Sequence, residues 1–205
     1  MLERALRVFW RHGYEATSIA ALTAAMDIRP PSLYAAFGDK RRLFGAVVER
    51  YGQGPGAFAA RALAEEPAAY PAMSRVLYEA AGHYTDPGHP PGCMIISAAT
   101  NCTPASQDVR AELLALREGQ RQAFQAKIAD DVSAGRLPAW VDAAALATFY
   151  AAVLQGMSTQ AADGASRTDL EAIAAYALSA WPSGELSTES RSSRRSSLVA
   201  DSKGA

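Results

Sequence analysis

The first fifty residues place apolar side chains at the three- and four-residue intervals that are typical of short helices. Leu2, Leu6 and Phe9 share one face of the first segment, and Leu33 and Phe37 share one face of a later segment. Glycines and prolines interrupt the pattern between the segments. The pattern predicts helices over about residues 2–12, 18–26, 30–37 and 40–51.

The second and third of these predicted helices are joined by a tight turn. Thr17 or Ser18 supplies an oxygen that can cap the first of the pair. Pro30 suits the first turn of the next helix, where an N–H group has no intrahelical partner anyway. Such a pair predicts a helix-turn-helix, whose second helix can enter the major groove of DNA.

Three strings in this region carry a family resemblance. They are Gly13–Ser18, Ile28–Lys40 and Leu43-Phe44, and together they extend over essentially residues 2–51. They closely resemble the DNA-binding domain of TetR-family transcriptional regulators. The resemblance implies an all-α fold, with an N-terminal three-helix helix-turn-helix DNA-binding domain and a C-terminal helical domain for ligand binding and dimerisation.

The chain departs from the family pattern at two places. The family usually has glycine in the turn, where this chain has Asp27. Aspartate adopts the left-handed backbone conformation more easily than most residues, so we expect the turn to survive. The other departure is at the N-terminus, where Met1-Leu2-Glu3-Arg4 leads almost directly into the first helix. We expect either that the usual basic arm is absent or that the true start lies upstream.

Charge supports a DNA-binding role for the N-terminal segment. Residues 1–51 carry eight Lys and Arg against five Asp and Glu, whereas residues 52–182 carry eight against thirteen. We expect Tyr34 and Lys40 to contact phosphates, and Arg29, Ser32 and Ala35 to face base edges. The full predicted set of DNA-binding residues is Thr17, Ser18, Arg29, Pro30, Ser32, Tyr34, Ala35 and Lys40.

The remainder of the chain also shows a helical pattern and predicts no strand. A glycine-rich stretch at residues 52–56 is the expected boundary between a DNA-binding domain at 1–51 and a second domain at 52–182. Residues 183–205 hold eight serines and almost no apolar side chains, so we predict a disordered tail. The predicted helices of the second domain span about residues 57–66, 68–84, 92–101, 106–134, 142–162 and 168–181.

The resemblance implies a homodimer and a small-molecule effector. In the family, the last two helices form a four-helix bundle with those of a second subunit, and a two-fold dimer suits a palindromic operator. The middle helices combine apolar side chains with a few polar groups, as small-molecule sites do. The same residues at helical spacing also fit a plain core. The predicted ligand-binding residues are Phe58, Tyr78, Cys93, Met94, Ser97, Asn101, Phe124, Tyr150 and Met157.

Cys93 offers an alternative sensing chemistry. It follows Pro90-Pro91-Gly92 in the first turn of a predicted helix, where the helix N-terminus is expected to lower the pKa of a thiol. A repressor that senses electrophiles or oxidants through Cys93 is therefore a second hypothesis. Cys102 lies nine residues further, about 13 Å along an intact helix, and is too far away for an intrahelical disulfide.

Other functional classes find little support in the sequence. His83 and His89 flank the loop before Cys93, but no third residue at a recognisable spacing completes a catalytic set or a zinc site. We therefore predict no enzyme, no metal and no cofactor. The sequence shows no signal peptide or long apolar run, which predicts a soluble, cytoplasmic protein without a membrane partner. A protein–protein adaptor without operator binding is the remaining alternative, and the cations at Arg29 and residues 40–42 argue against it.

Overall fold

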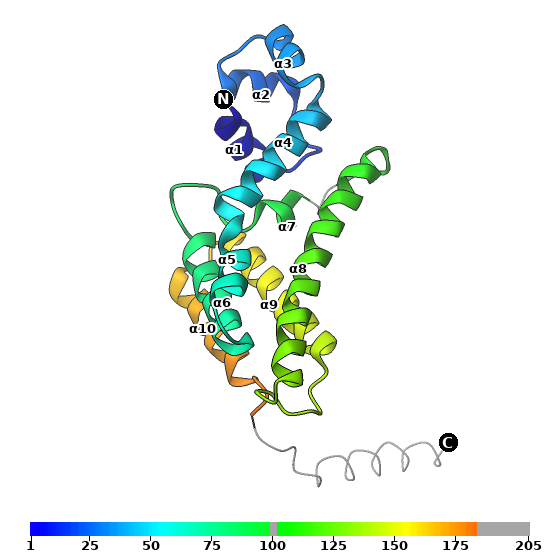
Figure 1. Cartoon of the computed structure of the whole chain (residues 1–205). Helices are drawn as coiled ribbons and strands as arrows, with labels where there is room; N and C mark the ends of the chain where they lie inside the picture. The colour runs from blue at the N-terminus through cyan, green and yellow to red at the C-terminus, as the bar shows by residue number, and fades with distance from the viewer. Residues whose placement is uncertain (99–101, 184–205) are drawn as a thin grey trace, which may run out of the picture.

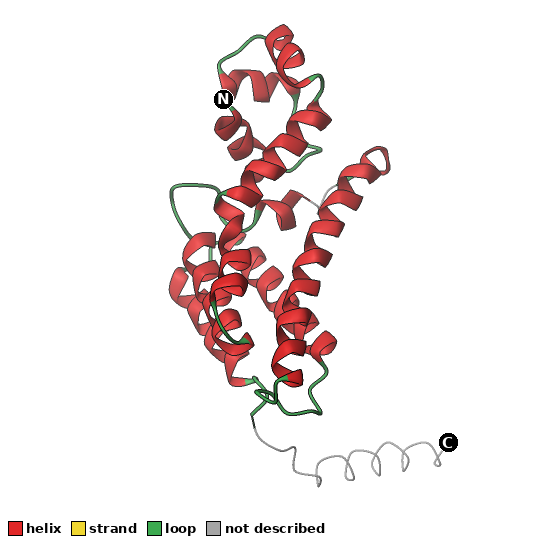
Figure 2. Cartoon of the chain, viewed as in Figure 1, coloured by secondary structure: helices red, strands yellow, loops and turns green. Residues whose placement is uncertain are grey.

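The computed structural model describes residues 1–98 and 102–183, and in those residues every regular element is helical (Figures 1 and 2). The predicted all-α fold is confirmed. The α-helices are α1 (Leu2–His12), α2 (Ile19–Met26), α3 (Pro30–Phe37), α4 (Lys40–Gln53), α5 (Phe58–Glu65), α6 (Ala69–Tyr84), α7 (Met94–Ala98), α8 (Gln107–Ser133), α9 (Ala143–Ala162) and α10 (Arg167–Ser179). Two short 3-10 turns, η1 (Pro55–Ala57) and η2 (Pro104–Ser106), precede α5 and α8.

Local chemistry fixes the ends of the N-terminal helices. The Ser18 side chain caps α2 by accepting from the Ala21 N–H, and the Asp39 side chain caps α4 by accepting from the Arg42 N–H. Asp27 adopts the left-handed conformation, with φ 58° and ψ 51°, as its place in the turn predicts. These four helices begin and end within two residues of the predicted bounds.

Two clusters of buried side chains hold the described residues together. One cluster is centred on α5, α6, α9 and α10, with Phe124 and Ile128 joining from the C-terminal half of α8. The other, the N-terminal cluster, lies under the helix-turn-helix and includes Phe9, Leu33 and Phe44. Met94 of α7 and Leu113 of α8 belong to this second cluster. The N-terminal unit, formed by α1 to α4, is therefore packed directly against α7 and the first half of α8.

The elements around α7 differ most from the sequence-based expectation. The predicted helix over 92–101 is observed as α7 over Met94–Ala98 only, and residues 99–101 lie outside the described residues. Figure 1 shows α8 running beside the column formed by α4 and α5, with α7 between them. Apart from Ser183, the predicted tail also lies outside the described residues.

Candidate DNA-binding surface and effector cavity

The helix α3 projects from the N-terminal end of the molecule, where it is anchored by one buried side chain (Figure 1). Leu33 is fully buried in the N-terminal cluster. The other residues predicted to lie on or beside α3 are exposed, and they form a continuous polar and small-residue surface: Arg29, Pro30, Ser32, Tyr34 and Ala35. Their number and exposure suit insertion into a groove of DNA.

The remaining predicted DNA-binding residues occupy different environments. Ser18 is exposed at the start of α2, where its hydroxyl is already used as the helix cap. Thr17 is only 1% exposed, and its hydroxyl donates to the Gly13 carbonyl at 2.6 Å. The structure therefore places the Thr17 side chain inside the turn between α1 and α2 rather than on the surface.

Lys40 lies at the N-terminus of α4, beside an aromatic ring. Its ammonium nitrogen is 4.4 Å from the centre of the Tyr14 ring and 3.5 Å from the Glu15 carbonyl oxygen. Partial burial lowers the pKa of Lys40 from its ordinary value, and the nearby Glu15 carboxylate opposes that shift. These contacts hold a cation at the end of a helix where free N–H groups favour an anion.

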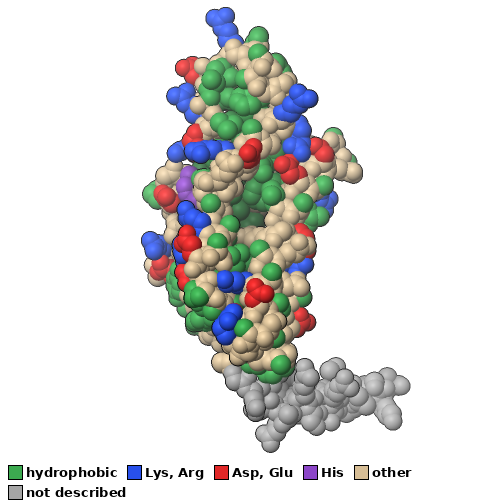
Figure 3. Space-filling model, in the orientation of Figure 1, with side chains coloured by type: hydrophobic (Ala, Val, Ile, Leu, Met, Phe, Trp, Pro, Cys, Tyr) green, Lys and Arg blue, Asp and Glu red, His purple; other side chains and the backbone are tan. Residues whose placement is uncertain are grey.

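A cavity of about 370 Å³ opens between α4, α5, α7 and α8. Figure 3 shows apolar side chains in a hollow at the middle of the molecule, in the region where α8 stands beside α4 and α5. The apolar wall includes Val48, Phe58, Leu63, Ile95, Ile96 and Leu116. The polar groups at the cavity come from Tyr51, Tyr84, Cys93, Arg117 and Gln120.

Two of the predicted ligand-binding residues, Phe58 and Cys93, line this cavity. Others lie elsewhere: Tyr78 is exposed on α6, and Met94 is buried in the N-terminal cluster. Ser97 is half-buried on α7 and is not among the lining residues, and Asn101 lies outside the described residues. Three more are buried core side chains away from the cavity lining, namely Phe124, Tyr150 and Met157.

Sequence reasoning missed the polar residues that α8 contributes. Arg117 and Gln120 are three residues apart, a spacing that puts two side chains on the same side of a helix. Leu116 and Ala123 flank them and also line the cavity. A polar pair within an apolar stripe on a long helix was the signal that could have identified them.

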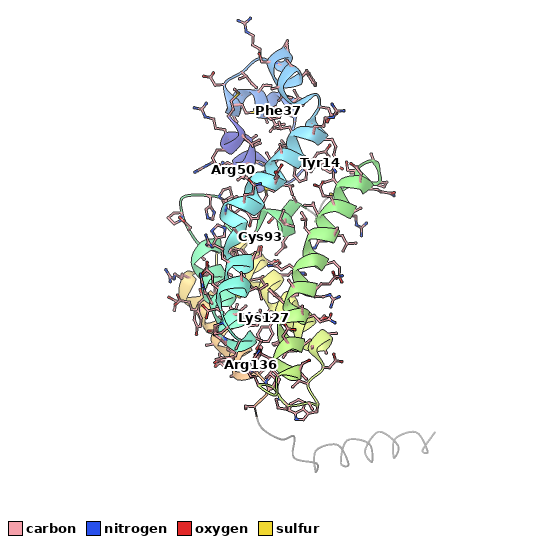
Figure 4. All side chains as sticks on the ribbon, viewed as in Figure 1. Tyr14, Phe37, Arg50, Cys93, Lys127 and Arg136 are labelled. Atoms are coloured by element: carbon pink, nitrogen blue, oxygen red, sulfur yellow. The ribbon has the colours of Figure 1, made fainter. Side chains whose placement is uncertain are left out.

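Cys93 lies near the centre of the molecule (Figure 4) and is one of the residues that line the cavity. The Tyr51 hydroxyl donates to the Cys93 sulfur at 3.3 Å, and the Cys93 N–H donates to the Ser158 hydroxyl at 2.8 Å. Burial raises the pKa of the Cys93 thiol, and this outweighs the contacts that favour the thiolate. The expectation of a lowered pKa is therefore corrected, because burial dominates over the position at a helix start.

A cluster of Trp10, His83 and His89 joins α1 to α6 and the loop that follows it. The Trp10 ring stacks on His89 with 4.4 Å between ring centres, and His89 Nε2 lies 3.2 Å from His83 Nδ1. His89 Nδ1 donates to the Pro90 carbonyl, so in the neutral pair His83 is the donor to His89. Neither Trp10 Nε1 nor His83 Nε2 has a hydrogen-bond partner in the part of the chain that the structure describes.

The His83 environment predicts acid sensitivity of the fold. Burial, and to a smaller extent the neighbouring His89, lowers the pKa of His83 to about 4, while Asp86 opposes the shift. An unfolded histidine titrates near 6.5, so the unfolded chain binds more protons between about pH 6.5 and 4. We expect the urea midpoint to fall as the pH is lowered through this window, and to fall less in His83→Gln. The exposed His12→Gln is the control, and an unchanged pH dependence in His83→Gln would contradict this account.

Arg41 of α4 connects the N-terminal unit to α8 by charge. Its guanidinium pairs with Asp108 at 2.5 Å and with Glu112 at 2.7 Å. The hydrogen bond from Arg41 holds the pKa of Asp108 below its usual value. Near this pair, Glu15 accepts hydrogen bonds from the Thr103 N–H and hydroxyl. Together these contacts tie the helix-turn-helix unit to the beginning of the helix that walls the cavity.

The described residues contain neither a group of metal ligands nor a helix that could span a membrane. In residues 1–98 and 102–183, no three His, Cys, Asp or Glu side chains are grouped so that they could hold a metal ion. Within the same residues, none of the helices combines the length and the apolar character needed to cross a bilayer.

Comparisons with known proteins show which family this chain is similar to. The family model for bacterial regulatory proteins of the tetR family matches residues 1–47, and the model for the tetracyclin repressor-like C-terminal domain matches residues 71–177. The HTH-type transcriptional repressor ComR of Escherichia coli (strain K12) is 35% identical over 182 residues, which cover 88% of this chain and 87% of ComR. The repressor BdcR of the same strain is 32% identical over 170 residues, covering 83% of this chain and 81% of BdcR.

A solved structure extends the comparison to three dimensions. A cysteine mutant of the TetR-family regulator CifR, complexed with 26-bp double-strand operator DNA, has a TM-score of 0.85 and 42% sequence identity. The similarity covers 88% of this chain and 95% of the CifR chain. The chain therefore belongs to the TetR family and is a DNA-binding transcriptional regulator.

Proposed function

We propose that the chain is a homodimeric, non-enzymatic repressor in the cytoplasm that binds a palindromic operator through α3 and is released by a small-molecule effector. The observation that carries the proposal is the position of the cavity. Its wall includes Val48 and Tyr51 of α4, the helix that begins at Lys40 in the DNA-binding unit. An effector that displaces this wall acts directly on an element of that unit. Two relatives named as repressors and a relative bound to operator DNA support the same role.

Homodimerisation is supported by the surface of α9 and α10. Tyr176 is 80% exposed on α10, and Phe149 is also exposed on α9. Both helices are rich in alanine, which lets helices approach closely. Large exposed aromatic side chains beside small residues favour an interface with a second copy. A two-fold dimer would present two α3 helices to the two halves of a palindrome.

Effector binding would act by shifting the population of DNA-binding conformations. A ligand changes the affinity for DNA only if it binds the two conformations with different strength. Coupling of this kind is typically about 1–3 kcal/mol, or 5- to 150-fold in affinity. Cys93 enters the proposal as a wall residue rather than a reactive thiolate, because burial raises its pKa.

DNA recognition can be tested on Arg29 and Lys40. We expect Arg29→Ala to weaken operator binding by about 1–3 kcal/mol and to relax specificity at one position in each half-site. Lys40→Ala should weaken binding to all sequences and reduce the salt dependence, because a phosphate contact is lost. Gel shifts over a range of salt concentrations, with the DNA that lies upstream of the gene for this protein, measure both effects.

The matched control is Arg61→Ala, which removes an exposed arginine from α5 and leaves the helix-turn-helix unchanged. Operator affinity should stay within error in that variant. Unchanged affinity in both Arg29→Ala and Lys40→Ala would show that the DNA-docking assignment is wrong. A chain that binds no DNA at low salt would support the adaptor alternative instead.

A further inference from the structure

Arg117 places one cation in the wall of a mainly apolar cavity. Arg117 of α8 lines the cavity together with Gln120, and among residues 1–98 and 102–183 no acidic side chain lines it. The other titratable side chains that line the cavity are the Tyr51 and Tyr84 phenols and the Cys93 thiol. Burial raises the pKa of each of these three groups, so all are neutral at pH 7. Arg117 is therefore the charged group of the cavity wall.

Arg117 also differs in its partners from several other arginines of this domain. Arg75 lies against three glutamates, Arg121 pairs with Glu118, and Arg136 pairs with Asp131. Within residues 1–98 and 102–183, Arg117 forms no ion pair, and its Nη1 makes only a long 3.5 Å hydrogen bond to the Ile95 carbonyl. A guanidinium that borders a cavity without a carboxylate is placed to receive an anion from a ligand.

On these observations we propose that the effector is an apolar monocarboxylate, with its carboxylate on Arg117 and Gln120 and its hydrocarbon part against the apolar wall. The inference rests on the proposed effector function and specifies the ligand class. A planar guanidinium matches the two oxygens of a carboxylate, and the Gln120 amide can donate a further hydrogen bond. Phe58, Leu63 and Ile95 supply apolar surface for the rest of the molecule.

The size of the chamber suggests a specific probe. A volume of 370 Å³ corresponds to about twelve water molecules at the liquid density of 30 Å³ each. Decanoate has a comparable number of non-hydrogen atoms and carries one carboxylate. Decanamide has the same shape and no charge, so the pair isolates the contribution of the carboxylate.

The test measures binding of both probes to the full chain by calorimetry, alongside operator release. We expect decanoate to bind the wild type about tenfold or more tightly than decanamide, since a hydrogen-bonded charge is worth at least that factor. Arg117→Met should remove this preference, weakening decanoate while leaving decanamide nearly unchanged. Arg110→Met is the matched control, because Arg110 is exposed two turns earlier on α8 and does not line the cavity. Arg117→Gln is the second variant if the methionine variant folds poorly.

The outcomes separate this inference from the proposed function. Equal binding of decanoate and decanamide to the wild type, no binding of decanoate, or a preference that persists in Arg117→Met would each overturn the carboxylate assignment. If operator binding is intact and decanamide alone releases the DNA, the proposed function stands and this inference fails. If decanoate binds with the expected preference but no operator is bound, the cavity assignment stands and the repressor function fails.

Discussion

Replacing Asp131 by alanine is expected to lower the free energy of unfolding by about 2–4 kcal/mol. Asp131 lies at the end of α8 and is only 3% exposed. Its carboxylate accepts from the Ala69 N–H at the start of α6 at 2.7 Å, and from Arg136 at 2.8 and 2.6 Å. Without it, the fully buried N–H of Ala69 loses its partner, and an unsatisfied buried donor is costly.

Thermal unfolding measures this effect. A loss of that size lowers the Tm of a chain of this length by about 4–16 °C. Asp131→Asn keeps an oxygen that can accept from Ala69, so it should lose less stability than the alanine variant. The matched control is Asp130→Ala, because Asp130 is the exposed neighbour on the same helix. Equal Tm values for the two alanine variants would show that the contact between α8 and α6 contributes little.

Replacing Gly92 by alanine should cost about 2–3 kcal/mol or more, because two penalties combine. Gly92 has φ +77°, a conformation that residues with a side chain rarely adopt. A Cβ atom at this position would also lie 2.7 Å from the Ser158 carbonyl oxygen. Gly92 directly precedes Cys93, so relief of this clash would displace the start of α7, which forms part of the cavity wall.

Gly135→Ala is the control for backbone conformation alone. Gly135 has φ +69°, close to that of Gly92, but apart from its chain neighbours no atom of the described residues lies within 4 Å of a Cβ placed there. The difference in free energy of unfolding between the two variants therefore isolates the crowding against α9. Urea unfolding of both variants provides the measurement, and an equal loss would show that α7 shifts freely to accept the methyl group.

Much of the N-terminal unit could be predicted because its signals are local. Helix spacing, caps and breakers act over a few residues, so α1 to α4 were placed within two residues of their observed bounds. The left-handed turn at Asp27 was expected from the family pattern, which usually has glycine there, together with the tolerance of aspartate for this conformation. The exposure of Arg29 and Tyr34 followed from the position of Leu33 on the buried face of α3.

The cavity could not be predicted in the same way, because it depends on where helices stand apart. Phe124, Tyr150 and Met157 have the residue types of a ligand site, but their neighbours fill the space around them. Tyr150 even donates its hydroxyl to the Ala177 carbonyl, which satisfies it within the core. Arg117 resembles any solvated cation of a long helix until the distance between α8 and α5 is known. The raised pKa of Cys93 likewise depends on burial by distant segments.

The charged contacts of Arg41 give ionic strength two separate actions on this chain. The Arg41, Asp108 and Glu112 side chains are 35%, 61% and 31% exposed, and ion pairs in such positions weaken as salt is added. Added salt therefore weakens these ion pairs between the helix-turn-helix unit and α8. It also screens the attraction between the protein and DNA phosphates. Under the proposed function, effector-induced release measured at one salt concentration would combine the two effects. Release curves at several salt concentrations, with Asp108→Asn as a reference that lacks the Arg41–Asp108 ion pair, would separate them.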